Sequence, residues 1–329
     1  MERTSAEKPC TAVSASPAAA DAHGAAVVGS ESELLAAALP FLEQGLRDGD
    51  LVALTCPPET VDLLFRALGE RAAAVESEPR MSLLGSRAPD ALVTCRGFLE
   101  RAAANGAGRL RVVAEVDFGA DPADWREGQR FESAYNRLMV GAPVSAICLY
   151  DRRRLPGEVV DSAAATHPHL VAGTTWSVSP DFRDPAAYIR ALPRPRESAV
   201  NSAPVLVIDD APALVDLRHR LGAALAQHVP DTPQREDLHL GVSEVAANAF
   251  RHGRRPVTAR MWTDGRSVVC TITDSGTGFD DPLAGFLPAH GLDLSRGGMG
   301  LWLARKLWDH VDLVHDPSGL TVRLSARLR

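Results

Sequence analysis

The sequence has no apolar run near the roughly 20 residues that span a membrane, and no phosphate loop of the form GxxxxGK followed by Ser or Thr. It has only five cysteines in 329 residues and no CxxC pair, which favours a reduced protein over a disulfide-rich one. The formal net charge is −7, so the basic excess of dedicated nucleic-acid binders is missing. We therefore expect a cytoplasmic protein that binds neither membranes nor nucleic acid directly.

The first half of the chain alternates strand-like and helix-like segments. Apolar residues at a spacing near 3.6 predict a helix from Glu31 to Arg47, between apolar strands at 25–28 and 51–55. Further helices are predicted at 58–68, 89–105, 125–140 and 155–165, and further strands at 110–114 and 144–150. This alternation predicts an α/β domain with a mainly parallel sheet covered on both faces. The residues before it, 1–21, are predicted to be a disordered tail.

The last third has a different pattern. Prolines punctuate a charged stretch at 179–203, which predicts a linker or docking segment. From residue 204 onward we predict a strand at 204–208, helices at 212–228, 234–251 and 300–309, and strands at 257–262, 267–273, 311–315 and 320–326. This order predicts an α+β two-layer sandwich, with helices on one face of a largely antiparallel sheet.

Glu244, Asn248 and His252 are spaced four residues apart, so they share one face of a predicted helix. Mg²⁺ prefers oxygen ligands and completes its shell with water and substrate phosphates. The Asn248 carbonyl oxygen suits that role without adding a negative charge that would repel ATP. Glu244, one turn earlier, is a candidate general base. On its own, the segment fits an amphipathic helix with a polar outer face equally well.

Asp274 ends a predicted strand and precedes Gly276 and Gly278. A carboxylate accepts a hydrogen bond from the exocyclic amine of adenine but repels the carbonyl of guanine, which predicts selectivity for adenine. The glycines would let the backbone approach a base closely. The alternative is a plain turn between two strands.

A glycine-rich stretch precedes the last predicted helix, and the free N–H groups of a helix N-terminus bind phosphates readily. It contains Arg296, Gly297, Gly298 and Gly300. A flexible linker is the alternative for these glycines. In this order, the three segments resemble the nucleotide site of the ATPase superfamily of histidine kinases, gyrase and the Hsp90 chaperone. The resemblance implies a Bergerat-type fold, bound ATP and Mg²⁺, and phosphate contacts at the glycine-rich lid.

Residues 237–253 and 298–309 resemble anti-sigma factor serine/threonine kinases. That resemblance implies that Glu244 is the catalytic base, that Asn248 is the Mg²⁺ ligand and that Asp274 is the adenine contact. Arg296 is the best candidate for stabilising γ-phosphate charge, and Met299 departs from the Arg or Ile common in this lid motif. The implied partners are a sigma factor, its antagonist protein, or both.

Two other functions stay open for this part of the chain. The first is a non-catalytic switch that sequesters a sigma factor and uses ATP only to set its shape. The second is an atypical sensor histidine kinase. His219 and His228 lie on a predicted helix, but the sequence shows no antiparallel hairpin with an acidic neighbour that would make either one a phosphoacceptor.

Residues 22–178 resemble the MEDS sensory domain. The resemblance rests on His23 with its strand and on the segments 41–50, 110–115 and 147–156. It implies a RecA-like α/β fold without a phosphate loop, and a small-molecule ligand such as a hydrocarbon derivative. The resemblance makes His23 a candidate ligand contact. Glu115 and Tyr150 are further candidates, because polar residues at the carboxyl ends of parallel strands line the crevice of such sheets.

The sequence thus predicts a sensor at 22–178, a linker at 179–203 and an ATP-binding effector at 204–329. A sensor fused to a kinase domain predicts a signalling regulator whose ligand alters the effector, with a homodimer as one option for its assembly.

Overall fold

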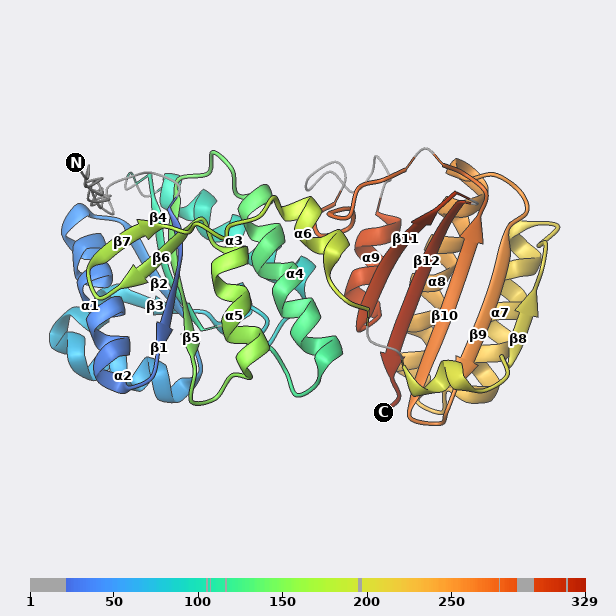
Figure 1. The fold of residues 1–329 in the computed structure, drawn as a ribbon, viewed down its shortest axis with the longest axis horizontal. Helices are drawn as coiled ribbons and strands as arrows, with labels where there is room; N and C mark the ends of the chain where they lie inside the picture. Colours follow the sequence, from blue (N-terminus) through green and yellow to red (C-terminus); the bar gives the residue numbers. More distant parts are fainter. Residues whose placement is uncertain are drawn as a thin grey trace, which may run out of the picture. The chain divides into compact units, whose positions relative to one another are not determined.

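The computed structural model describes residues 22–329 except 105, 107, 116, 195–196, 278, 289–298 and 318. By its internal contacts the chain divides into two units (Figure 1). Unit 1 holds the described residues of Met1–Glu78, Phe98–Val116 and Met139–Arg183, and unit 2 those of Pro79–Gly97, Asp117–Leu138 and Asp184–Arg329. Unit 2 thus includes two segments from the first half of the chain. The predicted boundaries at 178 and 204 stay a prediction, and the predicted tail at 1–21 lies outside the described residues.

Unit 1 is built on a seven-stranded sheet in the order β3-β2-β4-β5-β1-β6-β7. All neighbouring pairs in it are parallel except β6 with β7. The strands are β1 (His23–Val28), β2 (Leu51–Thr55), β3 (Val75–Ser77), β4 (Leu110–Glu115), β5 (Val144–Asp151), β6 (His169–Ala172) and β7 (Thr175–Val178).

Helices cover this sheet because its strands are apolar on both faces. α1 (Glu31–Asp48) begins where the Ser30 hydroxyl accepts a hydrogen bond from the backbone N–H of Glu33, and it ends at Gly49 in the left-handed region. α1 and α2 (Pro58–Leu68) pack on the face that carries Ile147 and Leu149. α5 (Gly157–Thr166) contacts β1 and β5.

A buried ion pair fixes the turn from α1 to β2. The Arg111 side chain on β4 is fully buried, and its Nε donates to Asp50 at 2.8 Å. The guanidinium also lies 4.8 Å from the centre of the Phe41 ring. A Cβ on Gly45 would come within 2.5 Å of Arg111, so only glycine leaves room for this side chain.

Unit 2 contains a five-stranded sheet in the order β11-β12-β10-β9-β8, in which every neighbouring pair is antiparallel. Its strands are β8 (Leu206–Ile208), β9 (Thr258–Thr263), β10 (Ser267–Asp274), β11 (His310–Asp316) and β12 (Gly319–Arg327). One face of the sheet is covered by α7 (Leu214–His228), α8 (Thr232–His252) and α9 (Gly300–Leu307) (Figure 1). Unit 2 also holds α4 (Pro122–Leu138), α6 (Pro185–Ala191) and the first part of α3 (Ala88–Ala104).

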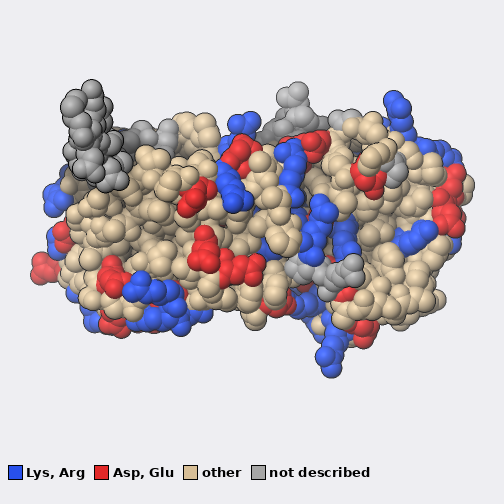
Figure 2. Space-filling model, in the orientation of Figure 1, with Lys and Arg blue, Asp and Glu red and all other residues tan. Residues whose placement is uncertain are grey.

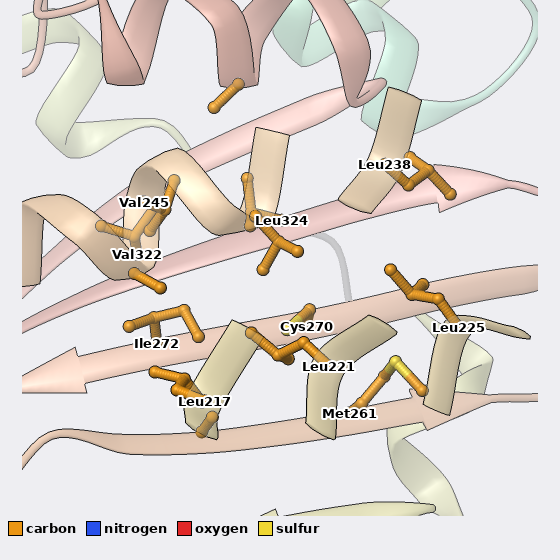
Figure 3. Close-up of a cluster of buried hydrophobic side chains, with 14 of the residues drawn as sticks. Leu217, Leu221, Leu225, Leu238, Val245, Met261, Cys270, Ile272, Val322 and Leu324 are labelled. Atoms are coloured by element: carbon orange, nitrogen blue, oxygen red, sulfur yellow. The ribbon is translucent and has the colours of Figure 1, made fainter. Parts of the chain in front are cut away.

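The core of unit 2 lies between its helices and the sheet (Figure 3). Leu217, Leu221 and Leu225 recur every four residues along α7, so all three point to the sheet. On β10, Val268, Cys270 and Ile272 alternate onto the same face. Asp274 continues this alternation, so its carboxylate is directed to the helix layer at the end of the core.

The expected mixed α/β composition with two sheets is confirmed. The sequence did not predict the short strands β3, β6 and β7. It also did not predict α6, which lies in the expected linker and buries Tyr188 and Ile189.

Figure 2 shows basic and acidic side chains on the visible faces of both units. Among the described residues, no helix is both long enough and apolar enough to span a bilayer.

Trp308, just after α9, closes the core of unit 2. It is fully buried, and its indole N–H donates to the carbonyl oxygen of Leu238 at 3.1 Å. We predict that Trp308→Ala lowers the free energy of unfolding by about 3–5 kcal/mol, because it leaves a cavity in a packed core. The half-buried Trp302 is the matched control. Urea denaturation followed by circular dichroism measures both variants, and equal losses would contradict this role for Trp308.

Candidate functional site

The site is built at the C-terminal end of α8. The helix starts where the Asp231 carboxylate accepts from the backbone N–H of Gln234, and a proline occupies its first turn. Leu238, Val242 and Val245 are buried against the sheet. This packing sets the rotation of the helix and leaves Asn248 half-buried at the edge of the core.

The Asp274 carboxylate joins the end of α8 to the end of β10. It is buried, and its Oδ1 accepts from the backbone N–H of Gly276 at 2.7 Å and of Arg254 at 3.2 Å. A Cβ on Gly253 would lie 2.3 Å from the Asp274 Cγ, and a Cβ on Gly276 would lie 2.7 Å from its Oδ1. The two glycines are therefore needed because the backbone passes so close to this carboxylate.

Asn248 meets the start of α9. A Cβ on Gly300, the first residue of α9, would come within 2.6 Å of the Asn248 amide nitrogen. The side chain of the expected Mg²⁺ ligand therefore lies against the helix N-terminus that was expected to bind phosphate. Two segments about fifty residues apart in sequence meet at this point.

A cavity of about 960 Å³ lies next to these residues. Asn248, Asp274 and Gly276 contribute polar groups to its wall. Arg137, His252 and Asp281 also line it, and the apolar side chains of the lining include Val245, Ile272, Leu283, Leu301 and Val322. An apolar cleft with a few convergent polar groups is the usual form of a small-molecule site, and this volume is in the range of such pockets.

Arg305, on α9, contacts Ala284 and Phe286 in the segment that precedes this helix. Its Nε donates to the carbonyl oxygen of Ala284 at 2.9 Å, and its guanidinium lies 4.4 Å from the centre of the Phe286 ring. Burial is the main cause that lowers the pKa of Arg305 to about 10. The sequence analysis missed this residue. Its only signal was a basic residue between the apolar residues of the last helix.

Glu244 lies one turn before Asn248 and is not part of the cavity wall. Its Oε1 is 3.5 Å from the Arg218 Nη2 of α7. His252, by contrast, lines the cavity. Gly278, Arg296, Gly297 and Gly298 lie outside the described residues, so their expected contacts stay predictions.

The candidate sensory residues lie on two faces of the unit 1 sheet. Paired residues of adjacent parallel strands point to the same face, and alternate residues point to opposite faces. His23 pairs with Ala146 and Glu115 pairs with Leu149, so His23 and Tyr150 share one face and Glu115 lies on the other. Glu115 accepts from the Thr60 hydroxyl at 2.7 Å and pairs with Arg154 at 3.3 Å.

Known families match both halves of the chain. Residues 22–168 match the family described as MEDS, the MEthanogen/methylotroph, DcmR Sensory domain. Residues 208–326 match the histidine kinase-like ATPase domain family. The expected fusion of a MEDS segment to an ATPase segment of this type is therefore confirmed.

One solved structure similar to this chain contains the RsbU and RsbW domains of Rv1364c from Mycobacterium tuberculosis. It has 20% sequence identity and a TM-score of 0.27 over 39% of this chain. The match spans about a third of that protein's length, with 32% of it covered. No curated protein matches the chain.

The contact between Gly300 and Asn248 leads to the first prediction for the site. Gly300→Ala would push the Asn248 side chain away from α9, so we expect nucleotide affinity to fall at least about tenfold, as a displacement costing 1.4 kcal/mol or more would produce. Gly97→Ala is the matched control, because its Cβ would meet nothing within 4 Å. Calorimetric titration of the full chain measures both variants. Wild-type affinity in Gly300→Ala would show that Asn248 does not need its present position.

Burial raises the pKa of the Glu115 carboxyl above its ordinary value of 4.5, although the Thr60 hydrogen bond opposes the shift. The folded state therefore favours the protonated carboxyl more than the unfolded state does. The contribution of Glu115 to the free energy of unfolding falls as the pH rises through the raised pKa. We predict that Glu115→Gln raises the unfolding midpoint at pH 7, and that this gain disappears as the pH falls below 4.5.

The matched control is Glu59→Gln, because exposed Glu59 binds the same arginine, with 2.9 Å between Glu59 Oε1 and Arg154 Nη1. It should give no gain at pH 7. Thermal denaturation of the full chain at pH 4 and pH 7 tests both variants. A gain for Glu115→Gln that is the same at both pH values would contradict the raised pKa.

Proposed function

We propose that the chain is a signalling regulator, in which a Bergerat-type domain binds Mg-ATP and acts as an anti-sigma-type serine/threonine protein kinase. The observation that carries the proposal is that Asn248 and Asp274 line one cavity while Gly300 lies against Asn248, all within the segment that matches the histidine kinase-like ATPase family. Three sequence segments that separately suggested Mg²⁺, adenine and phosphate binding supply these residues.

Asp274 is proposed to select adenine. Its Oδ1 already accepts two backbone N–H groups, which hold the carboxylate in a fixed orientation. The proposal assigns Oδ2 to the exocyclic amine of adenine. Guanine would bring a carbonyl oxygen against this buried carboxylate, and an unmatched buried polar group costs about 1–3 kcal/mol. The apolar wall with Ile272 and Leu301 would enclose the flat faces of the base.

Mg²⁺ and the phosphates are proposed to lie beside Asn248 and the start of α9. The amide oxygen of Asn248 would take one position of the Mg²⁺ shell, while phosphate oxygens and water take others. Bound Mg²⁺ would neutralise charge on the phosphates. The backbone N–H groups at the start of α9 would add hydrogen bonds to them. Arg305 acts as a positioning residue, because it holds the segment before α9 through Ala284 and Phe286.

Glu244 is the proposed base for the hydroxyl that attacks the γ-phosphate. It lies on α8 one turn before Asn248, so the two side chains share one face of the helix. The substrate would be a serine or threonine of an antagonist protein, and the second partner a sigma factor. This assignment rests on the resemblance of residues 237–253 to anti-sigma kinases.

One observation favours a non-catalytic switch as the second candidate. Glu244 lies outside the cavity wall and is paired with Arg218 of α7. If that pair persists with ATP bound, the carboxylate would hold α7 against α8 instead of accepting a proton. The unit would then use ATP only to set its shape for partner binding.

The N-terminal segment is proposed to sense a small molecule and to alter the affinity of the ATPase segment for ATP or partner. The family match over residues 22–168 supports a sensory role. A ligand can shift the effector only by its differential affinity for two states, which is about 1–3 kcal/mol in typical allosteric proteins.

The adenine assignment is tested by titrating the full chain with ATP and GTP in the presence of Mg²⁺. We expect clear preference for ATP, and Asp274→Asn should reduce that preference by about tenfold or more, as a lost contact worth about 1–3 kcal/mol would. The exposed Asp209→Asn is the control. Equal affinity of the wild-type chain for GTP would contradict the role of Asp274.

Phosphoryl transfer separates the two candidate functions. With antagonist proteins captured from the native cytoplasm, Glu244→Gln should bind ATP normally but transfer phosphate about 10²–10⁴-fold more slowly, as expected for a lost general base. Glu236→Gln, exposed on the same helix, is the control. Acid-stable phosphate on the partner indicates serine or threonine, and acid-labile phosphate indicates histidine. ATP-dependent partner binding without any transfer would favour the switch.

A further inference from the structure

Three side chains of metal-binding type meet inside unit 1. They are His23 at the start of β1, Cys148 in the middle of β5 and His167 directly after α5. Their ligand atoms lie within 4.8 Å of one another, and all three residues are buried. The sequence analysis did not connect them, because 125 residues separate His23 from Cys148.

The sheet register explains why His23 and Cys148 face each other. Cys148 pairs with Ala25, and His23 is two residues before Ala25 on the same strand. Residues two apart on a strand point to the same face. The two side chains are therefore diagonal neighbours, with 3.3 Å between His23 Nε2 and Cys148 Sγ.

α5 delivers the third side chain to this face. The helix contacts β1 and β5 and ends at Thr166, so the next residue lies over the two strands. The ring of His167 lies 4.2 Å from that of His23 and meets Tyr150 edge to face at 5.6 Å. His167 is fully buried.

The hydrogen bond of His167 selects the nitrogen that can bind a metal. Its Nδ1 lies 3.0 Å from the carbonyl oxygen of Ala163. A carbonyl oxygen can only accept, so Nδ1 carries the proton and Nε2 carries the lone pair. Metal-binding histidines commonly donate their other ring N–H to a carbonyl or carboxylate, which fixes the ring and its tautomer.

The spacing also fits a tetrahedral ion. Zn²⁺ binds histidine nitrogen at about 2.0 Å and cysteine sulfur at about 2.3 Å, which places the two ligand atoms about 3.5 Å apart at a tetrahedral angle. The His23 nitrogen and the Cys148 sulfur are already 3.3 Å apart. Modest side-chain rotations within the 4.8 Å limit would bring the His167 nitrogen to the same ion.

We propose that His23, Cys148 and His167 bind a divalent transition metal of the zinc class. A thiolate and two imidazoles favour Zn²⁺ and its neighbours over Mg²⁺ or Ca²⁺, which prefer oxygen. The ion would join β1, β5 and the end of α5 inside the sensory segment. This site does not depend on the proposed ATP site, since it lies in the other unit. The competing explanation is a metal-free cluster in which the Cys148 thiol hydrogen-bonds to His23.

The first test uses the wild-type full chain. The protein is stripped with a chelator, then titrated with Zn²⁺ and with Co²⁺, whose absorption reports thiolate ligation. We expect one equivalent of tightly bound metal, a sulfur-to-cobalt charge-transfer band, and an unfolding midpoint that rises with free Zn²⁺ because the ion binds the folded state. No stoichiometric binding and no charge-transfer band would overturn the proposal.

The second test assigns the ligands. Cys148→Ser should abolish the charge-transfer band, and His167→Ala should weaken Zn²⁺ binding by at least tenfold, since even losing a partner of a ligand costs 10–100-fold. The matched controls are Cys56→Ser, whose buried thiol donates to the carbonyl oxygen of Val113, and His169→Ala on β6. Both should bind metal as the wild type does. A band that survives in folded Cys148→Ser, or wild-type affinity in folded His167→Ala, would overturn the assignment. If Cys148→Ser does not fold, the wild-type titration and His167→Ala decide.

Discussion

The geometry of the candidate site depends on the hydrogen bonds that the Asp274 carboxylate accepts from backbone N–H groups. One oxygen binds the N–H groups of Arg254 and Gly276, so it joins the segment after α8 to the segment after β10. The position of Asn248 depends on α8, and the cavity wall depends on β10. A single buried acceptor therefore sets the distance between the residues expected to bind Mg²⁺ and adenine. The close approach of Gly253 and Gly276 to this carboxylate follows from the same constraint.

Sequence periodicity predicted the long elements and failed for the short ones. α1, α8 and β10 have enough residues for a 3.6- or two-residue repeat to be visible, and each was predicted within two residues of its observed ends. β3 has three residues and β6 has four, too few for any repeat, and they exist because neighbouring strands supply hydrogen bonds. α6 was hidden by the prolines around it, although Pro185 occupies the first turn, where proline is tolerated.

The functional candidates also differ in how far the sequence could indicate them. Glu244, Asn248 and Asp274 could be proposed from the sequence because each belongs to a short motif with a recognisable chemistry. Arg305 and His167 act through partners distant in sequence, Ala284 and Phe286 for the arginine and His23 for the histidine. No local sequence pattern predicts such contacts. The pairing register that places His23 beside Cys148 is likewise a property of the folded sheet, not of either strand alone.

The two halves of the chain also show that matching a family motif does not by itself mark a functional residue. In the segments that resemble the MEDS domain, Phe41, Gly45 and Asp50 surround the buried Arg111 and fix a turn. Removing one partner of such a pair leaves a buried charge, which costs about 3–5 kcal/mol, so these residues have a structural reason to be present. Asn248 has no comparable structural reason, because it lies half-buried on a cavity wall and against a helix N-terminus.

His23 differs from both the structural residues around Arg111 and the cavity-lining Asn248. It is buried as Arg111 is, but it lies beside a thiol and a second imidazole, and a cluster of that composition is chemically suited to a metal. Burial, partners and side-chain chemistry together, more than the motif, therefore separate structural residues from candidates for function.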